Sequence, residues 1–352
     1  MRAENSGADI MNEIDSLFEE VPRKRVGFFP TPIEKLGNIS QKYDQNIYIK
    51  RDDLTGPGFG GNKIRKLEFI VADALEKGAT HMITYGGFQT NHGRQMVSAC
   101  RRFGLEPILF LRGTEKPEKF RGNLHLDKIM DAEIHYIPVG LDEEKEAMER
   151  ATAEAEERIE ELESEGHKCY DCPIGGFNVS GCLGFIWGFK ELKDQLEEHS
   201  IDLDYIVHAS GSGGTLTGLM MGEKISNYDV EILPFGVSKN EGKESEISKM
   251  SRKIADYLGI EEHISEEEVK IDYEHFGEGY CIPSQESTNA IKELAREEGI
   301  ILGPTYTAKA MAGLFDYIEK NKIPQNSDIL FWHTGGTPTI FAERNIVGKL
   351  YD

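Results

Sequence analysis

Apolar and polar residues follow one another along the chain in two alternating patterns, which predict strands and helices in turn. Short apolar runs predict strands over residues 47–51, 82–85, 107–111, 134–138, 205–209, 232–237 and 329–332. Apolar residues that recur at helical spacing predict helices over residues 10–18, 63–77, 91–103, 124–130, 142–164, 181–197, 215–225, 244–258, 284–298 and 306–320. A last helix is predicted after Gly336, and the acidic residues 260–270 are predicted to form an irregular connection.

This alternation predicts an α/β fold with parallel sheets and helices on both faces. A chain of 352 residues is long enough for two lobes. The composition changes between Cys172 and Gly184, where we expect the chain to cross from one lobe to the other. The predicted smaller lobe spans residues 63–175 and is inserted in a larger lobe made of residues 1–62 and 176–352. Ligands of such folds bind beyond the carboxyl ends of the strands.

The stretch GPGFGGNKIRKLE (residues 56–68) combines a glycine-rich turn with the start of an amphipathic helix. Lys63 lies in the first turn, on the apolar face that continues through Leu67, Ile70, Val71, Ala74 and Leu75. The opposite face, predicted to meet solvent, carries Arg65, Glu68, Asp73 and Glu76. Lys63 is therefore predicted to point inward, where desolvation lowers the pKa of an amine and makes it a nucleophile or a Schiff-base former.

The structural alternative for Lys63 is a stem that packs at the helix end while the ammonium group reaches water. Its neighbours favour the chemical interpretation. Asn62 is predicted to cap the helix. The glycines at 58, 60 and 61 leave room for a flat group to approach the backbone closely.

Charge and cysteine content exclude several function classes. The net charge is −22, which argues against nucleic acid or an anionic membrane as a partner. No apolar run is long enough to span a membrane. The five cysteines are an odd number, which predicts a reducing, cytoplasmic setting. Cys169 and Cys172 have the spacing of a redox or metal pair, but no second pair completes a metal site, so a structural role and no bound metal are predicted.

A second glycine-rich loop follows the predicted strand 205–209 and leads directly into a helix, which predicts a phosphate cradle made of free amides and a helix N-terminus. The cradle residues are Gly211, Ser212, Gly213, Gly214 and Thr215. The structural alternative is a tight turn without a ligand. Leu216 stands where a dinucleotide fingerprint needs glycine, and the Walker signature is absent, so the loop suits one isolated phosphate.

Polar side chains gather where the helix 91–103 begins, at Gln89, Thr90, Asn91 and His92. Together they are predicted to bind a substrate carboxylate. Alternatively, Thr90 acts only as the N-cap of the helix, and a lone histidine such as His92 is more often structural than catalytic. Tyr280 and Tyr306 each stand in a loop beside glycine and proline, although isolated tyrosines are usually packing residues.

A buried lysine, one phosphate cradle and a glycine-lined slot together suggest pyridoxal phosphate as cofactor. Five stretches carry a specific resemblance, namely KRDDLTGPGFGGNKIRKLE, YGGFQTNHGRQ, IGGFNVSGCLG, HASGSGGTLTG and LGPTYTAKAMAGL. In this order and spacing they resemble the fold-type II pyridoxal-phosphate enzymes, whose fold is like that of the tryptophan synthase β-subunit. Within that group the chain resembles the family of D-cysteine desulfhydrase and 1-aminocyclopropane-1-carboxylate (ACC) deaminase.

The resemblance implies roles for single residues. Lys63 would hold the cofactor covalently, Asn91 would bond its ring hydroxyl, and Gly211 to Thr215 would bind its phosphate. Tyr280 and Tyr306 resemble the active-site tyrosines of the family.

Two positions bear on the choice of substrate. The resemblance implies that Thr307 occupies the place that faces the pyridine nitrogen, where the deaminases are expected to carry glutamate. Since threonine cannot keep that nitrogen protonated as a carboxylate would, β-elimination is favoured over ring opening. Thr90 replaces the usual serine of the family and adds a methyl group.

The predicted function is therefore a lyase that acts on a small amino acid with a leaving group at Cβ. D-cysteine is the first choice of substrate, L-cysteate or a similar amino acid the second, and ring opening of ACC ranks lower. In this prediction Lys63 removes the α-proton, Tyr280 or Tyr306 assists proton transfer, and the family resemblance implies a homodimer. The alternatives from other classes are a nucleotide-dependent α/β enzyme and a non-catalytic protein that binds pyridoxal phosphate.

Overall fold

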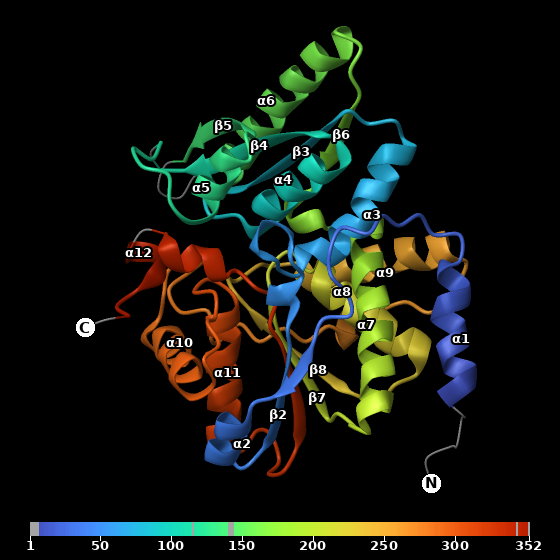
Figure 1. Ribbon diagram of the computed structural model, residues 1–352, viewed down its shortest axis with the longest axis vertical. Helices are drawn as coiled ribbons and strands as arrows, with labels where there is room; N and C mark the ends of the chain where they lie inside the picture. The colour runs from blue at the N-terminus through green and yellow to red at the C-terminus, as the bar shows by residue number, and fades with distance from the viewer. Residues whose placement is uncertain (1–6, 115, 140–143, 343, 351–352) are drawn as a thin grey trace.

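The computed structural model describes residues 7–114, 116–139, 144–342 and 344–350 (Figure 1). Strands and helices alternate along most of the chain and build two separate sheets, one of five strands and one of four. Figure 1 shows the smaller sheet and its helices above the larger one, with α3 (Lys63–Glu76) near the level where the two parts meet. The predicted α/β architecture is confirmed.

The larger sheet has the order β1-β2-β9-β7-β8. Its strands are β1 (Ile33–Lys35), β2 (Asn46–Lys50), β9 (Asp328–Trp332), β7 (Tyr205–Ser210) and β8 (Glu231–Gly236). Neighbouring residues of the central strands point to opposite faces, so Ile206 packs with Phe185 of α7 (Val179–His199) while Val207 packs with Leu314 of α11 (Thr307–Glu319). Both faces are therefore covered by helices, as parallel sheets require.

The smaller sheet has the order β5-β4-β3-β6, with all strands parallel. The strands are β5 (Glu133–Pro138), β4 (Glu106–Gly113), β3 (His81–Gly87) and β6 (Cys169–Cys172). The acidic helix α6 (Glu144–Ser164) packs on one face through small residues such as Ala147 and Ala151, which are fully buried. α4 (Asn91–Phe103) packs on α3 and β4 in the core of the opposite face.

The remaining helices are α1 (Gly7–Phe18), α2 (Gly37–Tyr43), α5 (Gly122–Ile129), α8 (Gly214–Ser226), α9 (Lys243–Leu258), α10 (Gln285–Glu298) and α12 (Arg344–Val347). Short 3-10 helices occur at η1 (Asp52–Leu54), η2 (Pro57–Phe59), η3 (Ile174–Gly176), η4 (Glu266–Glu268) and η5 (Thr337–Phe341). The predicted helices lie close to these bounds. Residues 142 and 143, where the acidic helix was predicted to begin, lie outside the described residues.

Apart from the short 3-10 helices, three elements of the described residues were not predicted, namely β1, α2 and β6. Each is short, so it has too few positions for a periodic pattern. β1 runs antiparallel to β2, which departs from the predicted parallel arrangement. In β6, Cys169 packs with the α6 core and Cys172 with the α3–α4 core, because residues three apart in a strand face opposite sides.

The prediction that Arg65 and Glu68 of α3 face solvent is wrong, because both side chains are buried. Glu68 accepts hydrogen bonds from the backbone N–H groups of Val26 and Gly27 at 2.8 and 3.1 Å. The N-terminal segment therefore covers the polar side of the helix. α7 packs on α3 as well, so α3 is enclosed by the chain rather than exposed along one face.

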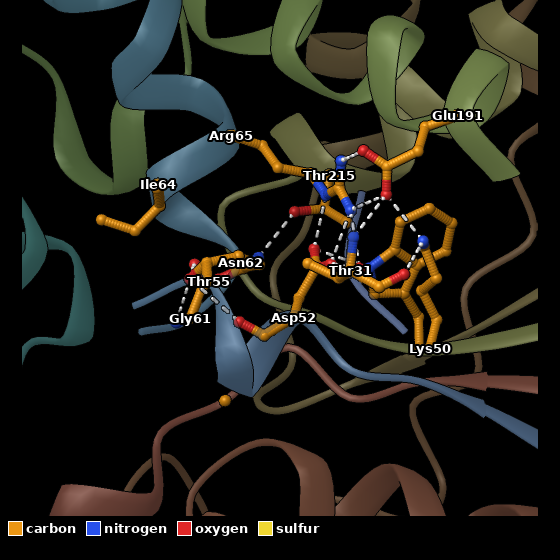
Figure 2. A network of polar contacts seen from close by, with 12 residues as sticks. Thr31, Lys50, Asp52, Thr55, Gly61, Asn62, Ile64, Arg65, Glu191 and Thr215 are labelled. Carbon is orange, nitrogen blue, oxygen red and sulfur yellow. Dashed lines mark hydrogen bonds and ion pairs between the residues drawn. The ribbon is translucent and has the colours of Figure 1, made fainter. Parts of the chain in front are cut away.

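Arg65 is the centre of a buried ion network (Figure 2). Its guanidinium pairs with Asp52 of η1 and with Glu191 of α7, each at 2.8 Å. Lys50 of β2 pairs with Glu191 at 2.6 Å, and the indole N–H of Trp332 donates to Asp52 at 2.8 Å. Burial alone would raise the pKa of Glu191, but Arg65 and Lys50 lower it to about 2. Two cations and two carboxylates thus neutralise each other in the interior and join α3 to β2, β9 and α7.

We predict that replacing Arg65 by Met destabilises the fold by about 3–5 kcal/mol, because Asp52 and Glu191 would keep buried charges without their main partner. Urea unfolding would measure the loss. The matched control is Lys77→Met, which removes an exposed ion pair with Asp73 at the end of the same helix and is expected to change stability by less than about 0.5 kcal/mol. Equal losses in the two variants would contradict a structural role for the network.

Candidate functional site

The cavity that contains most of the predicted site residues has a volume of about 700 Å³. It is lined by Tyr85 and Gly86 at the end of β3 and by Ala209 and Ser210 at the end of β7. The cavity therefore lies beyond the carboxyl ends of strands from both sheets, where ligands of α/β folds bind. A second depression, of about 930 Å³, runs beside β8 and is lined by none of the predicted site residues.

Lys63 is presented to this cavity by the glycine-rich turn that precedes α3. Gly61 has φ 122°, and a Cβ added there would lie 2.6 Å from the amide of Gln95, so only glycine fits. Asn62 does not cap the helix as predicted; its backbone is already helical, and its side-chain amide donates to the Thr215 hydroxyl at 3.0 Å. The residue before the lysine therefore ties α3 to the predicted phosphate cradle (Figure 2).

The amine of Lys63 lies in a desolvated environment beside a second lysine, Lys66. Burial lowers the pKa of Lys63 well below its ordinary value, and the positive charge of Lys66 lowers it further. Burial also lowers the pKa of Lys66, to about 8, and its amine donates to the Gly175 carbonyl at 3.0 Å. A neutral amine at position 63 is the form that attacks an aldehyde or accepts a proton.

The predicted phosphate cradle is formed by the turn between β7 and α8. A Cβ on Gly214 would lie 2.5 Å from the Lys66 amine, and one on Gly213, where φ is 95°, would lie 3.2 Å from the Lys243 side chain. Two lysines therefore flank backbone amides at a helix N-terminus, which is an arrangement that binds an anion. Neither lysine was predicted, although Lys66 stands one helical turn after Lys63, a spacing that places the two side chains on one face.

Thr90, Asn91 and His92 all line the cavity. The Thr90 hydroxyl accepts from the Gly93 N–H at 3.2 Å and so caps α4, which leaves its hydrogen available to a ligand. Burial and the two lysines lower the pKa of His92 well below its ordinary value, so this imidazole is neutral. Its Nδ1 has no hydrogen-bond partner in the described part of the chain, and its Nε2 lies 3.5 Å from the Cys172 sulfur.

Tyr280 and Tyr306 meet at the cavity although 26 residues separate them. Their hydroxyl groups form a hydrogen bond of 2.7 Å, and their rings pack edge to face at 5.8 Å. Burial raises the pKa of both phenols, so both are neutral at physiological pH. The Lys309 amine of α11 donates to the Gly279 carbonyl at 2.6 Å and holds the Tyr280 loop in place.

Gln89, Thr307 and, within the cradle, Gly214 are not among the residues that line the cavity. The Gln89 amide donates to the Arg121 carbonyl at 3.1 Å and accepts from the Asn123 N–H at 2.9 Å. The Thr307 hydroxyl accepts from the Gly303 N–H at 2.7 Å and is fully buried. The ligand-binding roles of Gln89 and Thr307 stay predictions.

These residues fit pyridoxal phosphate. The group needs an amine for its aldehyde, an anion site for its phosphate and room for a flat ring. Lys63 supplies the first and the cradle supplies the second. Gly175 has φ 67°, and a Cβ there would lie 2.6 Å from the Ser212 hydroxyl and 3.5 Å from the Lys63 amine, so glycine keeps the space between amine and cradle open.

Neither a metal site nor a membrane-spanning helix occurs among the described residues. No group of three or more His, Cys, Asp and Glu side chains is arranged to hold a metal ion among them. Within the same residues, no helix has the length and apolar character that crossing a membrane requires.

Comparisons with known proteins give a consistent result. The family model described as "Pyridoxal-phosphate dependent enzyme" matches residues 25–335. A Thermotoga maritima protein with the provisional name 1-aminocyclopropane-1-carboxylate deaminase is 40% identical over 325 residues, which cover 89% of this chain and 96% of that protein. A D-cysteine desulfhydrase of Salmonella paratyphi A is 35% identical over 326 residues, 91% of this chain and 96% of that protein. A solved structure of an ACC deaminase homologue has a TM-score of 0.84 at 39% identity and covers 94% of this chain and 96% of its own.

We predict that borohydride reduction of the protein loaded with pyridoxal phosphate leaves the cofactor on Lys63 and not on Lys66, because of these two lysines Lys63 alone lines the cavity. Peptide mass mapping would locate the label. Lys63→Ala is expected to abolish both the label and turnover. Lys66→Met, the control one helical turn away, is expected to keep the label on Lys63 but to bind the cofactor roughly tenfold more weakly. A label on any other lysine would overturn the assignment.

Proposed function

The chain belongs to the family of pyridoxal-phosphate dependent enzymes, and we propose that it removes sulfide from D-cysteine by β-elimination. The overall reaction converts D-cysteine and water to pyruvate, ammonia and hydrogen sulfide. The observation that carries this proposal is the pairing, in one cavity, of a neutral amine at Lys63 with the neutral hydroxyl pair of Tyr280 and Tyr306. An elimination needs one group that accepts a proton and another that donates one.

The proposed roles of the residues follow from their protonation. When bound, pyridoxal phosphate withdraws electrons from the α-carbon of the amino acid attached to it. Lys63, released when the substrate amine takes its place, would accept the α-proton, since its lowered pKa keeps the free amine neutral. The hydrogen-bonded hydroxyls of Tyr280 and Tyr306 donate a proton toward the departing sulfur. The Thr90 hydroxyl and the helix N-terminus that it caps bind the substrate carboxylate.

The residues that line the cavity also supply groups that can bind the cofactor. We propose that Lys63 holds the cofactor, that the Asn91 amide donates to its ring oxygen, and that the backbone from Gly211 to Thr215 binds its phosphate. Lys66 adds positive charge beside the cradle, whereas the charge of Lys243, which also lies beside it, is paired with Glu246. The free amides at the start of α8 complete the anion site.

Thr307 supports D-cysteine over ACC as the substrate. A carboxylate at this position would keep the pyridine nitrogen protonated and strengthen electron withdrawal, which ring opening of ACC demands. Threonine supplies no such charge, and its hydroxyl is engaged by the Gly303 backbone. The name of the Thermotoga maritima relative keeps ACC deamination as the second candidate.

We predict that, in a panel of D- and L-amino acids and ACC, D-cysteine gives the fastest release of keto acid, with pyruvate, sulfide and ammonia in equal amounts. 2-Oxobutanoate from ACC is expected to form at least roughly tenfold more slowly, because Thr307 leaves the ring nitrogen without a negative partner. Faster turnover of ACC than of D-cysteine would support the second candidate. Release of no keto acid from any substrate would favour a non-catalytic protein that binds the cofactor.

We also propose that the enzyme is a cytoplasmic homodimer. The five cysteines all lie within the described residues and form no disulfide bond there, which supports a reducing compartment. Phe28 and Phe59 are 64% and 70% exposed, and both border the loop at Gly56, beside the exposed Leu54. Neighbouring exposed apolar side chains of this size support a contact with a second copy of the chain.

Phe59→Glu is predicted to shift the enzyme from dimer to monomer in sedimentation experiments, because a charge would be buried at the interface. The matched control is Tyr257→Glu, which alters an exposed aromatic residue of α9 and is expected to leave the dimer intact. A dimer that survives Phe59→Glu would place the interface elsewhere.

A further inference from the structure

We propose that Asn123, which does not line the cavity, is a positioning residue that fixes which end of the Asn91 amide faces the cofactor. The inference rests on the proposed function, in which Asn91 donates to the ring oxygen of pyridoxal phosphate. Asn123 is fully buried at the start of α5, and Asn91 is the first residue of α4. The two side-chain amides meet, with the Asn123 Nδ2 2.7 Å from the Asn91 Oδ1.

Three further contacts hold the Asn123 side chain and backbone. The Arg94 Nε lies 2.8 Å from the Asn123 Oδ1, and the Asn123 Nδ2 lies 2.9 Å from the Gln89 carbonyl oxygen. The Asn123 backbone N–H donates to the Gln89 side-chain oxygen at 2.9 Å. Every polar atom of the Asn123 amide is therefore engaged by groups of the protein.

The chemistry of these partners allows only one orientation of the Asn123 amide. A guanidinium only donates hydrogen bonds, so the atom that faces Arg94 must be the oxygen. A backbone carbonyl only accepts, so the atom that faces Gln89 must be the nitrogen. Arg94 is itself fully buried and fixed by the Gly60 carbonyl, to which both of its terminal nitrogens donate at 3.1 Å.

The orientation of Asn123 decides that of Asn91. The second hydrogen of the Asn123 Nδ2 points at Asn91, so the Asn91 side-chain oxygen must accept this hydrogen bond. That leaves the Asn91 Nδ2 as the end of the amide that can serve a ligand in the cavity that Asn91 lines. Arg94, Asn123 and Asn91 thus form a chain of donors and acceptors that turns a hydrogen-bond donor toward the cofactor.

Burial of the Asn123 side chain stabilises the orientation of its amide. A buried amide that lost its partners would have no water to replace them. A donor in the cavity stabilises a negative charge on the ring oxygen of pyridoxal phosphate, whereas an amide oxygen there would repel it. Asn123 therefore affects cofactor affinity and the protonation of the bound cofactor without touching it.

Asn123→Asp tests the proposal, because a carboxylate accepts hydrogen bonds from Arg94 but cannot donate to Asn91. The Asn91 amide is then expected to turn, so that its nitrogen faces residue 123 and its oxygen faces the cavity. We expect the dissociation constant for pyridoxal phosphate to rise roughly ten- to a hundredfold. The visible absorption of the bound cofactor is expected to titrate at higher pH than in the wild type.

The matched control is Asp127→Asn, an exchange of the same two residue types one turn further along α5. Asp127 is also fully buried; burial raises its pKa to about 8 although the nearby Arg94 lowers it, and its carboxyl oxygens form no hydrogen bond with Asn91 or any other described residue. Its variant is expected to keep the wild-type titration and a dissociation constant within about twofold of the wild-type value. Asn123→Ala removes the donor without adding an acceptor and is expected to give an effect between those of the wild type and Asn123→Asp.

The outcomes separate this inference from the proposed function. Asn91→Ala tests the contact between Asn91 and the cofactor directly and is expected to weaken cofactor binding. If it changes neither affinity nor titration, the proposed role of Asn91 fails. If Asn91→Ala has its effect but Asn123→Asp and Asn123→Ala bind and titrate like the wild type, the positioning role alone is overturned.

Urea unfolding of the cofactor-free variants separates a loss of fold from a loss of orientation. Equal affinity losses in Asn123→Asp, Asn123→Ala and Asp127→Asn would also overturn the role, because they would reflect packing and not polarity.

Discussion

The neutralisation of charge around Arg65 is the constraint on which the rest of the structure depends. α3 is buried where it presents Lys63 to the cavity, so the cationic side chains in this part of the helix are removed from water as well. Asp52 and Glu191 balance Arg65 and Lys50, so the helix can be buried without a net internal charge. Since these partners come from separate segments, the same contacts fix α3 against both the larger sheet and α7.

The same helix carries two kinds of cation. Arg65 is paired with carboxylates on both sides and serves the fold. Lys63 and Lys66 form no ion pair within the described part of the chain, so desolvation is the largest effect on both amines and lowers their pKa values. A single turn of α3 thus carries both a charge that carboxylates of the protein neutralise and amines without such a partner, which are available to a cofactor.

The cavity is assembled from segments that cannot meet without the fold. β3 brings Thr90 and Asn91 from the smaller sheet, β7 brings the cradle from the larger sheet, and α11 fixes the tyrosine pair. Contacts between these segments are polar and specific, as between Asn62 and Thr215 or between Asn123 and Asn91. Small errors in packing would therefore change the chemistry of the site, because each contact sets the direction of a donor or acceptor.

The sequence by itself determined the longer strands and helices and the position of the glycine-rich turns. Glycine spacing predicted the turns at Gly61 and Gly213, and helical periodicity predicted that Lys63 points inward, since these signals depend on neighbours along the chain. Only the tertiary structure decided that Arg65 and Glu68 are buried, that Asn62 reaches Thr215 instead of capping its helix, and that Lys66 and Asn123 adjoin the site. The physical reason is that the burial and pairing of a side chain depend on which distant segment covers it. A periodic pattern predicts one buried face of a helix, but it does not predict whether another segment covers the opposite face.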